Sequence, residues 1–136
     1  MSNLPTVAGI YEAFGKGDVP AILAVLADDV EWEAWESNSS VDAGVPWMTP
    51  RHGKDEVGGF FETAAQMAIT DLQVLNMMEG GNTVAVELVI ETDLPTFGGG
   101  HYRDEEIHLW TFGDDGKVTR LRHYTDTAKH IAAFRH

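Results

Sequence analysis

The chain has 136 residues, of which 43% are hydrophobic, and it carries a formal net charge of -13 and no cysteine. One domain spanning residues 1–136 is expected from this length, and the hydrophobic content supports a packed core and excludes a disordered chain. The negative charge repels phosphate backbones, which makes nucleic acid a poor partner, and the lack of cysteine excludes disulfides and thiolate metal sites.

Neither a membrane anchor nor a secretory leader is expected. No apolar run approaches ~20 residues, the length that crosses a bilayer as a helix. The first residues, Met1 to Pro5, lack the basic segment followed by an apolar one that marks a signal peptide. Together with the missing cysteines, which fit a reducing compartment, these features predict a cytoplasmic protein without a membrane partner.

Three helices are predicted in the first half of the chain. The first begins near Pro5 and ends at Gly15-Lys16-Gly17, and Asp18 then caps a second helix that we expect to end near Asp28-Asp29. The third runs from about residue 53 to 67 and contains Gly58-Gly59, a pair that suggests close approach of another element or of a ligand. The apolar stripes at helical spacing are Val7, Ile10, Tyr11 and Phe14 in the first helix, and Val57, Phe60, Phe61 and Ala64 in the third.

A strand and a long loop separate the second and third helices. Residues 30–35 read V-E-W-E-A-W, and this alternation places Val30, Trp32 and Ala34 on one face of a strand. Residues 37–50 are rich in Ser, Gly and Pro and are expected to form a loop. Its apolar residues either pack on the body of the protein or cover a pocket as a lid, and they are Val45, Trp47 and Met48.

The second half of the chain alternates with a period of two and predicts an antiparallel meander. Helices grouped before such a run indicate an α+β domain: a cone-shaped, curved, mixed or antiparallel sheet with the three helices on its concave face. A cavity between sheet and helices is expected. A short C-terminal helix over residues 127–134 follows, with Asp126 as its N-cap and with Ala128, Ile131 and Ala132 turned inward. The expected strands are at about 72–79, 83–92, 102–112 and 118–126.

The last two strands place titratable side chains on one face. A four-residue turn at residues 113–116 sets Glu106 opposite His123, whereas a two-residue turn sets His108 there. In both registers, even positions of the first strand share a face with odd positions of the second. That face then holds Asp104, Glu106, His108, Trp110, Leu121, His123 and Thr125. The opposite face takes Ile107, Leu109, Val118 and Tyr124, an apolar surface that a partner subunit would cover.

The order of these elements and several short motifs resemble the SnoaL-like branch of the nuclear transport factor 2-like superfamily over nearly the whole chain. Each motif is weak alone, and their spacing together is specific for the fold. The motifs are Ile10-Tyr11-Glu12-Ala13-Phe14, Gly17-Asp18, Leu26-Ala27-Asp28-Asp29-Val30, Gly53-x-x-x-Val57-x-x-Phe60-Phe61, His108-x-Trp110-x-Phe112-x-x-x-Gly116-Lys117-Val118 and His123-Tyr124-x-Asp126-Thr127-Ala128.

This resemblance implies a pocket and frequent dimerisation through the sheet, but no single activity, because the superfamily includes isomerases, cyclases, hydrolases and domains that bind only proteins. Ketosteroid isomerases have two catalytic aspartates and an oxyanion tyrosine. At the matching positions this chain has Ala34, His108 and Ile10, so that mechanism is not expected. SnoaL-type cyclases use an acid near the end of the last strand, for which Asp126 is the best match.

We therefore expect His108 and Asp126 to act as acid/base groups in a cyclase-, isomerase- or hydrolase-like enzyme for an apolar or aromatic carbonyl compound. The alternative is a non-catalytic domain that binds a small molecule or a protein. No phosphate-binding loop is evident, and neither a cofactor nor a metal is expected, although Glu106, His108 and His123 would suit a metal if they converged. The partner is expected to be a second copy bound through the sheet. The residues expected to contact the ligand are Tyr11, Trp32, Phe60, Phe61, Glu106, Trp110 and His123.

Overall fold

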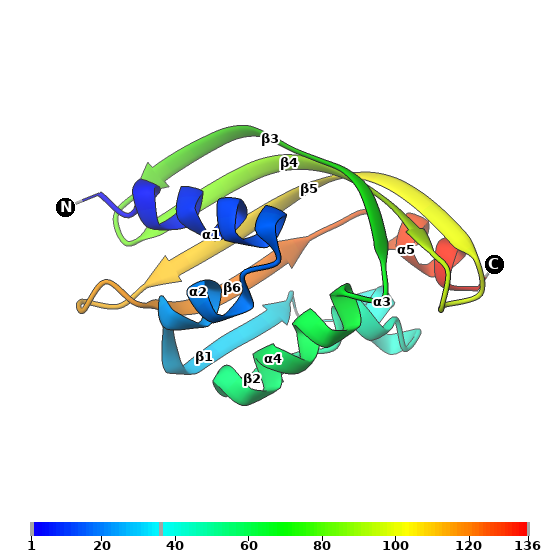
Figure 1. Cartoon of the computed structure of the whole chain (residues 1–136), viewed down its shortest axis with the longest axis horizontal. Coiled ribbons are helices and arrows are strands. Elements are labelled where there is room, and N and C mark those ends of the chain that lie inside the picture. The colour runs from blue at the N-terminus through cyan, green and yellow to red at the C-terminus, as the bar shows by residue number, and fades with distance from the viewer. Residues whose placement is uncertain (1, 36, 136) are drawn as a thin grey trace.

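The computed structural model describes residues 2–35 and 37–135 and shows a six-stranded sheet that curves without closing (Figure 1). The strand order is β2-β1-β6-β5-β4-β3. Neighbouring strands are antiparallel except β1 and β6, which pair in parallel. The strands are β1 (Leu26–Ala34), β2 (Arg51–His52), β3 (Ala68–Gly80), β4 (Thr83–Leu94), β5 (Gly100–Phe112) and β6 (Val118–Tyr124).

Three helices from the first half of the chain cover the concave side of this sheet (Figure 1). They are α1 (Leu4–Lys16), α2 (Val19–Ala24) and α4 (Gly53–Ala64). The C-terminal helix α5 (Thr127–Phe134) packs against β5. The predicted α+β class, with three helices on the concave face of a curved sheet, is confirmed. Inside the segment predicted as a loop, the chain also forms α3 (Ser39–Asp42) and a 3-10 turn, η1 (Pro46–Met48).

The predicted cap of α2 is confirmed, but its predicted end is wrong. The Asp18 carboxylate accepts a hydrogen bond from the backbone N–H of Ala21 at 3.3 Å. The helix ends at Ala24, and β1 already begins at Leu26, four residues before the predicted strand. Leu26 is 1% exposed and pairs with Val118 of β6. Pairing with a distant strand therefore overrides the local helical pattern of this segment.

The helix α4 ends at Ala64 instead of residue 67, and its two glycines have different surroundings. A Cβ added at Gly58 would meet nothing within 4 Å, whereas one at Gly59 would lie 2.7 Å from an Arg51 guanidinium nitrogen. The close approach inferred from this pair is thus a side-chain contact at one glycine. The closest backbone approach is at Gly100, where an added Cβ would overlap the carbonyl oxygen of Ala133 in α5.

The hairpin of β5 and β6 sets His108 directly opposite His123. The Gly113 N–H donates to the Lys117 carbonyl at 2.8 Å, so the turn differs from both predicted turns. The register then shifts by one residue between Thr111 and Phe112. This bulge turns Val118 into the core, where it is 0% exposed, and its predicted place on the outer face is wrong. The predicted parity of the histidine face holds beyond the bulge.

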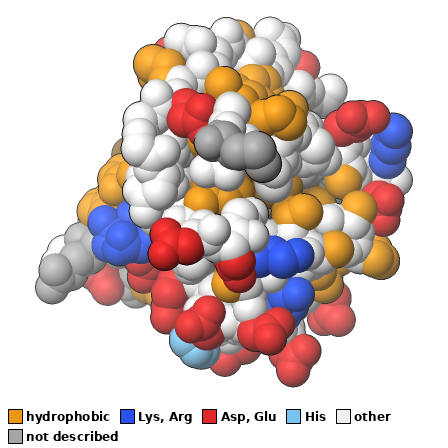
Figure 2. Space-filling view, turned by 90° about the vertical axis from the view of Figure 1, so that its left-hand side faces the viewer, with side chains coloured by type: hydrophobic (Ala, Val, Ile, Leu, Met, Phe, Trp, Pro, Cys, Tyr) orange, Lys and Arg blue, Asp and Glu red, His pale blue; other side chains and the backbone are white. Residues whose placement is uncertain are grey.

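Acidic side chains are spread over the lower part of the face in Figure 2, in agreement with the net charge of -13, and hydrophobic side chains lie at its top and across its middle. Among the described residues, the exposed large hydrophobic side chains belong to the edge strand β3, and they are Val74, Leu75 and Met78. In the part of the chain that the structure describes, no helix has the length and apolar character needed to cross a membrane.

Candidate functional site

A cavity of about 90 Å³ lies between the helices and the concave face of the sheet. It shares Phe14, Phe61 and Leu72, among others, with an outer groove of about 630 Å³ that borders α1, α4 and the start of β3. The groove therefore adjoins the cavity, and a ligand would enter from this side. The side chains predicted for the site that line the cavity are Tyr11, Trp32, Phe60, Phe61, Glu106, His108, Trp110 and His123.

The structure places Asp126 outside this cavity. Its side chain is exposed and borders a different surface pocket, next to Lys129. Asp126 occupies the N-cap position of α5, but its carboxylate makes no capping hydrogen bond. The cavity and this carboxylate therefore do not form one site.

Trp47 and Met48, from the segment predicted as a loop, are 4% and 3% exposed and line the cavity. Both roles considered for this segment are met in part, because its apolar residues pack on the body and two of them also border the cavity. Its Trp47 side chain belongs to a second hydrophobic cluster with Tyr102 of β5 and Ala133 of α5. The segment thereby forms a wall of the cavity.

A chain of hydrogen bonds runs along the cavity wall from Trp110 to Glu106. The Trp110 indole N–H donates to the Tyr11 hydroxyl at 3.1 Å, and this hydroxyl lies 2.7 Å from Nδ1 of His108. Nε2 of His108 lies 3.3 Å from a Glu106 carboxylate oxygen. Because an indole N–H is only a donor, Tyr11 is free to donate its proton to Nδ1, and the ring then donates from Nε2 to Glu106. The Tyr11 hydroxyl, the His108 imidazole and the Glu106 carboxylate are thus connected in series by hydrogen bonds.

Burial and these contacts shift the titration of the cavity groups. Burial raises the pKa of Tyr11 above its ordinary value, so the phenol keeps its proton. Burial alone would also raise the pKa of Glu106, but hydrogen bonds from His108 and His130 outweigh it and hold this pKa well below its usual range. Burial, followed by repulsion from His108, lowers the pKa of His123 to about 3. The cavity therefore contains a neutral phenol, a carboxylate and a neutral imidazole at pH 7.

A buried polar cluster that the sequence did not predict lies behind Glu106. The imidazole Nε2 of His130, in α5, is 2.8 Å from Asp104 and 3.1 Å from Glu106. The Trp47 indole N–H donates to Nδ1 of the same ring at 2.8 Å. In α5 the buried residues are His130 and Ala133, and the predicted inward positions of Ala128 and Ala132 are exposed. A histidine with three partners satisfies its polar atoms in a buried position.

The titration of His130 reflects opposing contacts. Burial disfavours its charged form, but hydrogen bonds to Asp104 and Glu106 outweigh burial and raise its pKa to about 9. The Trp47 N–H faces Nδ1, so a second proton on the ring would place two donors against each other. The Trp47 contact therefore opposes this rise in pKa, and the form that fits all three contacts is the neutral ring with its proton on Nε2.

Within residues 2–35 and 37–135, the group with metal-ligand spacing is Asp104, Glu106 and His130, in place of the set considered from the sequence. A metal on Nε2 of His130 would move the ring proton to Nδ1, where the Trp47 N–H opposes it. Both nitrogens of His108 are likewise engaged, by Tyr11 and by Glu106. These donor patterns suit a hydrogen-bonding network and do not suit a metal centre.

Polar atoms without partners also belong to lining residues. Among the described residues, the Trp32 indole N–H and the Thr125 hydroxyl are buried without a hydrogen-bond partner. The imidazole of His123 packs against Trp32, with ring centroids 6.0 Å apart. Buried polar groups are usually paired, so free donors around a cavity favour a ligand that carries an oxygen acceptor.

Comparisons with known proteins are in line with this geometry. A family model described as a SnoaL-like domain matches residues 7–121. An NTF2-like protein of unknown function from Burkholderia pseudomallei is 28% identical, with 100% of both chains covered and a TM-score of 0.79. TerC, co-crystallised with polyporic acid, is 21% identical over 98% of each chain, with a TM-score of 0.76. RV0760c from Mycobacterium tuberculosis, in complex with estradiol-17beta-hemisuccinate, is 21% identical over 95% of this chain and 98% of that one, with a TM-score of 0.71. No curated protein matches the chain.

Proposed function

The chain belongs to the SnoaL-like domain family, and we propose that it binds a small, uncharged, mostly apolar carbonyl compound and moves a proton to or from it. The observation that carries the proposal is the Tyr11–His108–Glu106 series on the cavity wall. The structures with polyporic acid and with estradiol-17beta-hemisuccinate support a ligand-binding role for the same fold. The cavity of about 90 Å³ is smaller than the roughly 150 Å³ of a cavity that holds benzene, so a ligand with a ring would extend into the outer groove.

In this proposal Tyr11 is the group that meets the carbonyl oxygen. When His108 takes a proton on Nδ1, this nitrogen becomes a donor to the Tyr11 oxygen, and the phenol proton turns toward the cavity. An O–H donor held in this way stabilises negative charge that develops on a carbonyl oxygen. Glu106 accepts the Nε2–H of His108 and fixes the orientation of that ring. In this scheme the neutral His123 receives the proton from the adjacent carbon, as a weak base because its pKa is lowered to about 3. Asp126 has no part in this scheme because it lies outside the cavity.

The direct test is proton exchange next to a carbonyl group. Acetophenone in D₂O should lose its methyl proton signals faster with the protein than in buffer alone, as followed by NMR. Exchange at the buffer rate for acetophenone and similar neutral ketones that demonstrably bind would refute the catalytic part. That result would favour the alternative of a non-catalytic binding domain, which the small volume left beside Trp32 and Trp110 supports.

The charge of the cavity makes a prediction about ligand selection. Among the described residues that line it, none is Lys or Arg, and Glu106 is an ionised carboxylate there. The other basic group at the cavity wall, His130, is already paired with Asp104 and Glu106 and is not free to hold a ligand carboxylate. A carboxylate ligand would therefore be repelled by Glu106, and benzoate should bind at least about tenfold more weakly than acetophenone at pH 7. Quenching of tryptophan fluorescence measures both affinities. In the Glu106→Gln variant, the affinities for benzoate and acetophenone should differ less. Equal affinities for the two compounds in the unaltered protein would contradict the prediction.

We also propose that the protein is a homodimer that associates through the convex face of the sheet. On this face Leu109 and Ile107 are half-buried, and Met78 pairs with Ala85, the neighbour of Leu109. Burial of such an apolar row would stabilise a two-fold contact. Light scattering after gel filtration should give twice the chain mass of 14.9 kDa, and Leu109→Glu should halve it. A monomer at every concentration tested would disprove this assembly.

A further inference from the structure

A buried cluster at the cavity wall contains two carboxylates that share one N–H, and two of its members, Glu106 and His130, line the cavity. His130, Asp104 and Glu106 are 1%, 2% and 6% exposed, so water does not separate them. Their ligand atoms all lie within 4.8 Å of one another. Two carboxylates this close in a buried place repel each other, and without a donor between them they tend to share a proton.

The two oxygens of Glu106 have different partners. One lies 3.3 Å from Nε2 of His108, on the cavity side, and the other lies 3.1 Å from Nε2 of His130, on the α5 side. Asp104 is held separately, because one of its oxygens also accepts the backbone N–H of Asp126 at 3.1 Å. The side chain of His130 is in turn oriented by the Trp47 indole at 2.8 Å. The carboxylate of Glu106 is thus fixed between the cavity and the C-terminal helix.

We propose that His130 is a positioning residue for the cavity: its Nε2–H separates Glu106 from Asp104, keeps Glu106 ionised and holds it toward His108. The effect of His130 on turnover depends on the proposed function, whereas its effect on the Glu106 carboxylate does not. Without this N–H, the second oxygen of Glu106 faces Asp104. The two carboxyl groups then retain a proton between them, and His108 loses the anion that accepts its Nε2–H.

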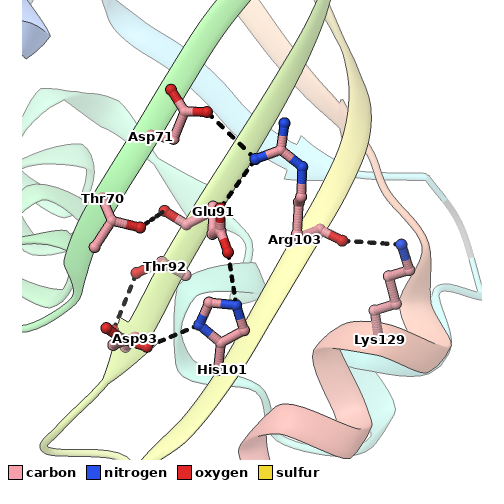
Figure 3. A network of polar contacts seen from close by, with 8 residues as sticks. All are labelled: Thr70, Asp71, Glu91, Thr92, Asp93, His101, Arg103 and Lys129. Atoms are coloured by element: carbon pink, nitrogen blue, oxygen red, sulfur yellow. Dashed lines mark hydrogen bonds and ion pairs between the residues drawn. The ribbon is translucent and has the colours of Figure 1, made fainter.

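A second histidine lies between two carboxylates on the protein surface and serves as a control for His130. Figure 3 shows His101 between Asp93 and Glu91, with its nitrogens 2.7 Å and 2.9 Å from their oxygens. Glu91 and Asp71 also accept hydrogen bonds from Arg103. This arrangement resembles that of His130, but the histidine is exposed and water can replace it as a donor. Its removal should therefore change nothing in the cavity.

The experiment follows the side-chain carboxyl carbon of Glu106 by NMR as the pH is lowered. His130→Leu should move the midpoint of this titration upward by about two units, because the carboxylate loses a donor and faces a like charge. His130→Gln, which keeps an N–H donor, should restore most of the difference, and His101→Gln should have no effect. A midpoint in His130→Leu equal to that of the unaltered protein would overturn the inference.

A second variant covers the case in which His130→Leu does not fold. Asp104→Asn keeps His130 in place and removes the competing charge, so the Glu106 midpoint should stay the same or fall. A rise in this variant would also overturn the inference. In the ketone exchange assay, His130→Leu should lower kcat with little change in KM, and His130→Gln should recover it. If the unaltered protein exchanges no ketone, the proposed function fails, whereas the carboxyl titration still decides the role of His130.

Discussion

His108→Ala is expected to reduce protein-catalysed exchange of ketone protons by a factor of about 10² to 10⁴, the range typical of a positioned acid/base group. The variant removes the acceptor of the Tyr11 proton and the donor to Glu106 together. Tyr11→Phe should lower the rate comparably while it leaves the cavity apolar and closely packed. The measurement is the initial rate of acetophenone deuteration by NMR at constant pH, with binding followed separately by fluorescence.

The control for this experiment is His52→Gln. His52 is an exposed histidine that lies 2.6 Å from Glu31, and it is not among the residues that line the cavity. It should leave the rate within the error of the assay. If His108→Ala and His52→Gln behaved alike in both rate and affinity, His108 would have no role in catalysis or binding.

Gly100→Ala is expected to destabilise the fold by about 3 kcal/mol, because the added methyl group would overlap the backbone carbonyl of Ala133. A backbone atom cannot rotate away, so α5 would have to shift from β5. Urea unfolding measures the change in the free energy of unfolding. A shift of α5 would also displace His130, so the same variant should weaken ligand binding.

Gly58→Ala is the matched control for Gly100→Ala. An added Cβ there meets nothing within 4 Å, and the site is inside a helix, so this variant should be stabilised by up to about 1 kcal/mol. Equal free energies of unfolding for the two variants would show that α5 can move at Ala133 without loss of stability, which would contradict the prediction. The opposite signs expected here separate a steric effect at one glycine from the general preference of helices for alanine.

Strong periodicity made most of the fold predictable from the sequence. The α1 stripe predicted the burial of Val7 and Ile10, and the alternation in β5 and β6 predicted a common face for His108 and His123. The exceptions share a physical cause, which is that contacts between distant segments override a local pattern. Leu26 joined β1 because Val118 lies beside it, and a one-residue bulge turned Val118 itself into the core.

The candidate site was predictable on the sheet and not on the C-terminal helix. Side-chain parity brought Glu106, His108 and Trp110 to the cavity with no knowledge of the packing. His130 was not predicted because histidine is usually assigned to the polar side of a helix. Its burial in α5 depends on the carboxylates of Asp104 and Glu106, which belong to β5. The one available signal was Asp104, an acidic residue at an inward position of β5, since a buried carboxylate needs a donor.

The parallel pairing of β1 with β6 has a consequence for how the chain acquires its structure. Glu33 and Arg122, which are 89 positions apart, form a hydrogen bond across this pair. Contacts over such separations form slowly, because the intervening chain loses much freedom before they contribute stability. During synthesis β1 therefore cannot complete its pairing until β6 has emerged from the ribosome. Until then β1 is paired only with the two-residue strand β2, where Arg51 lies opposite Trp32. The side of β1 that β6 later covers is open during this time, and apolar surface exposed in this way favours chaperone binding or aggregation.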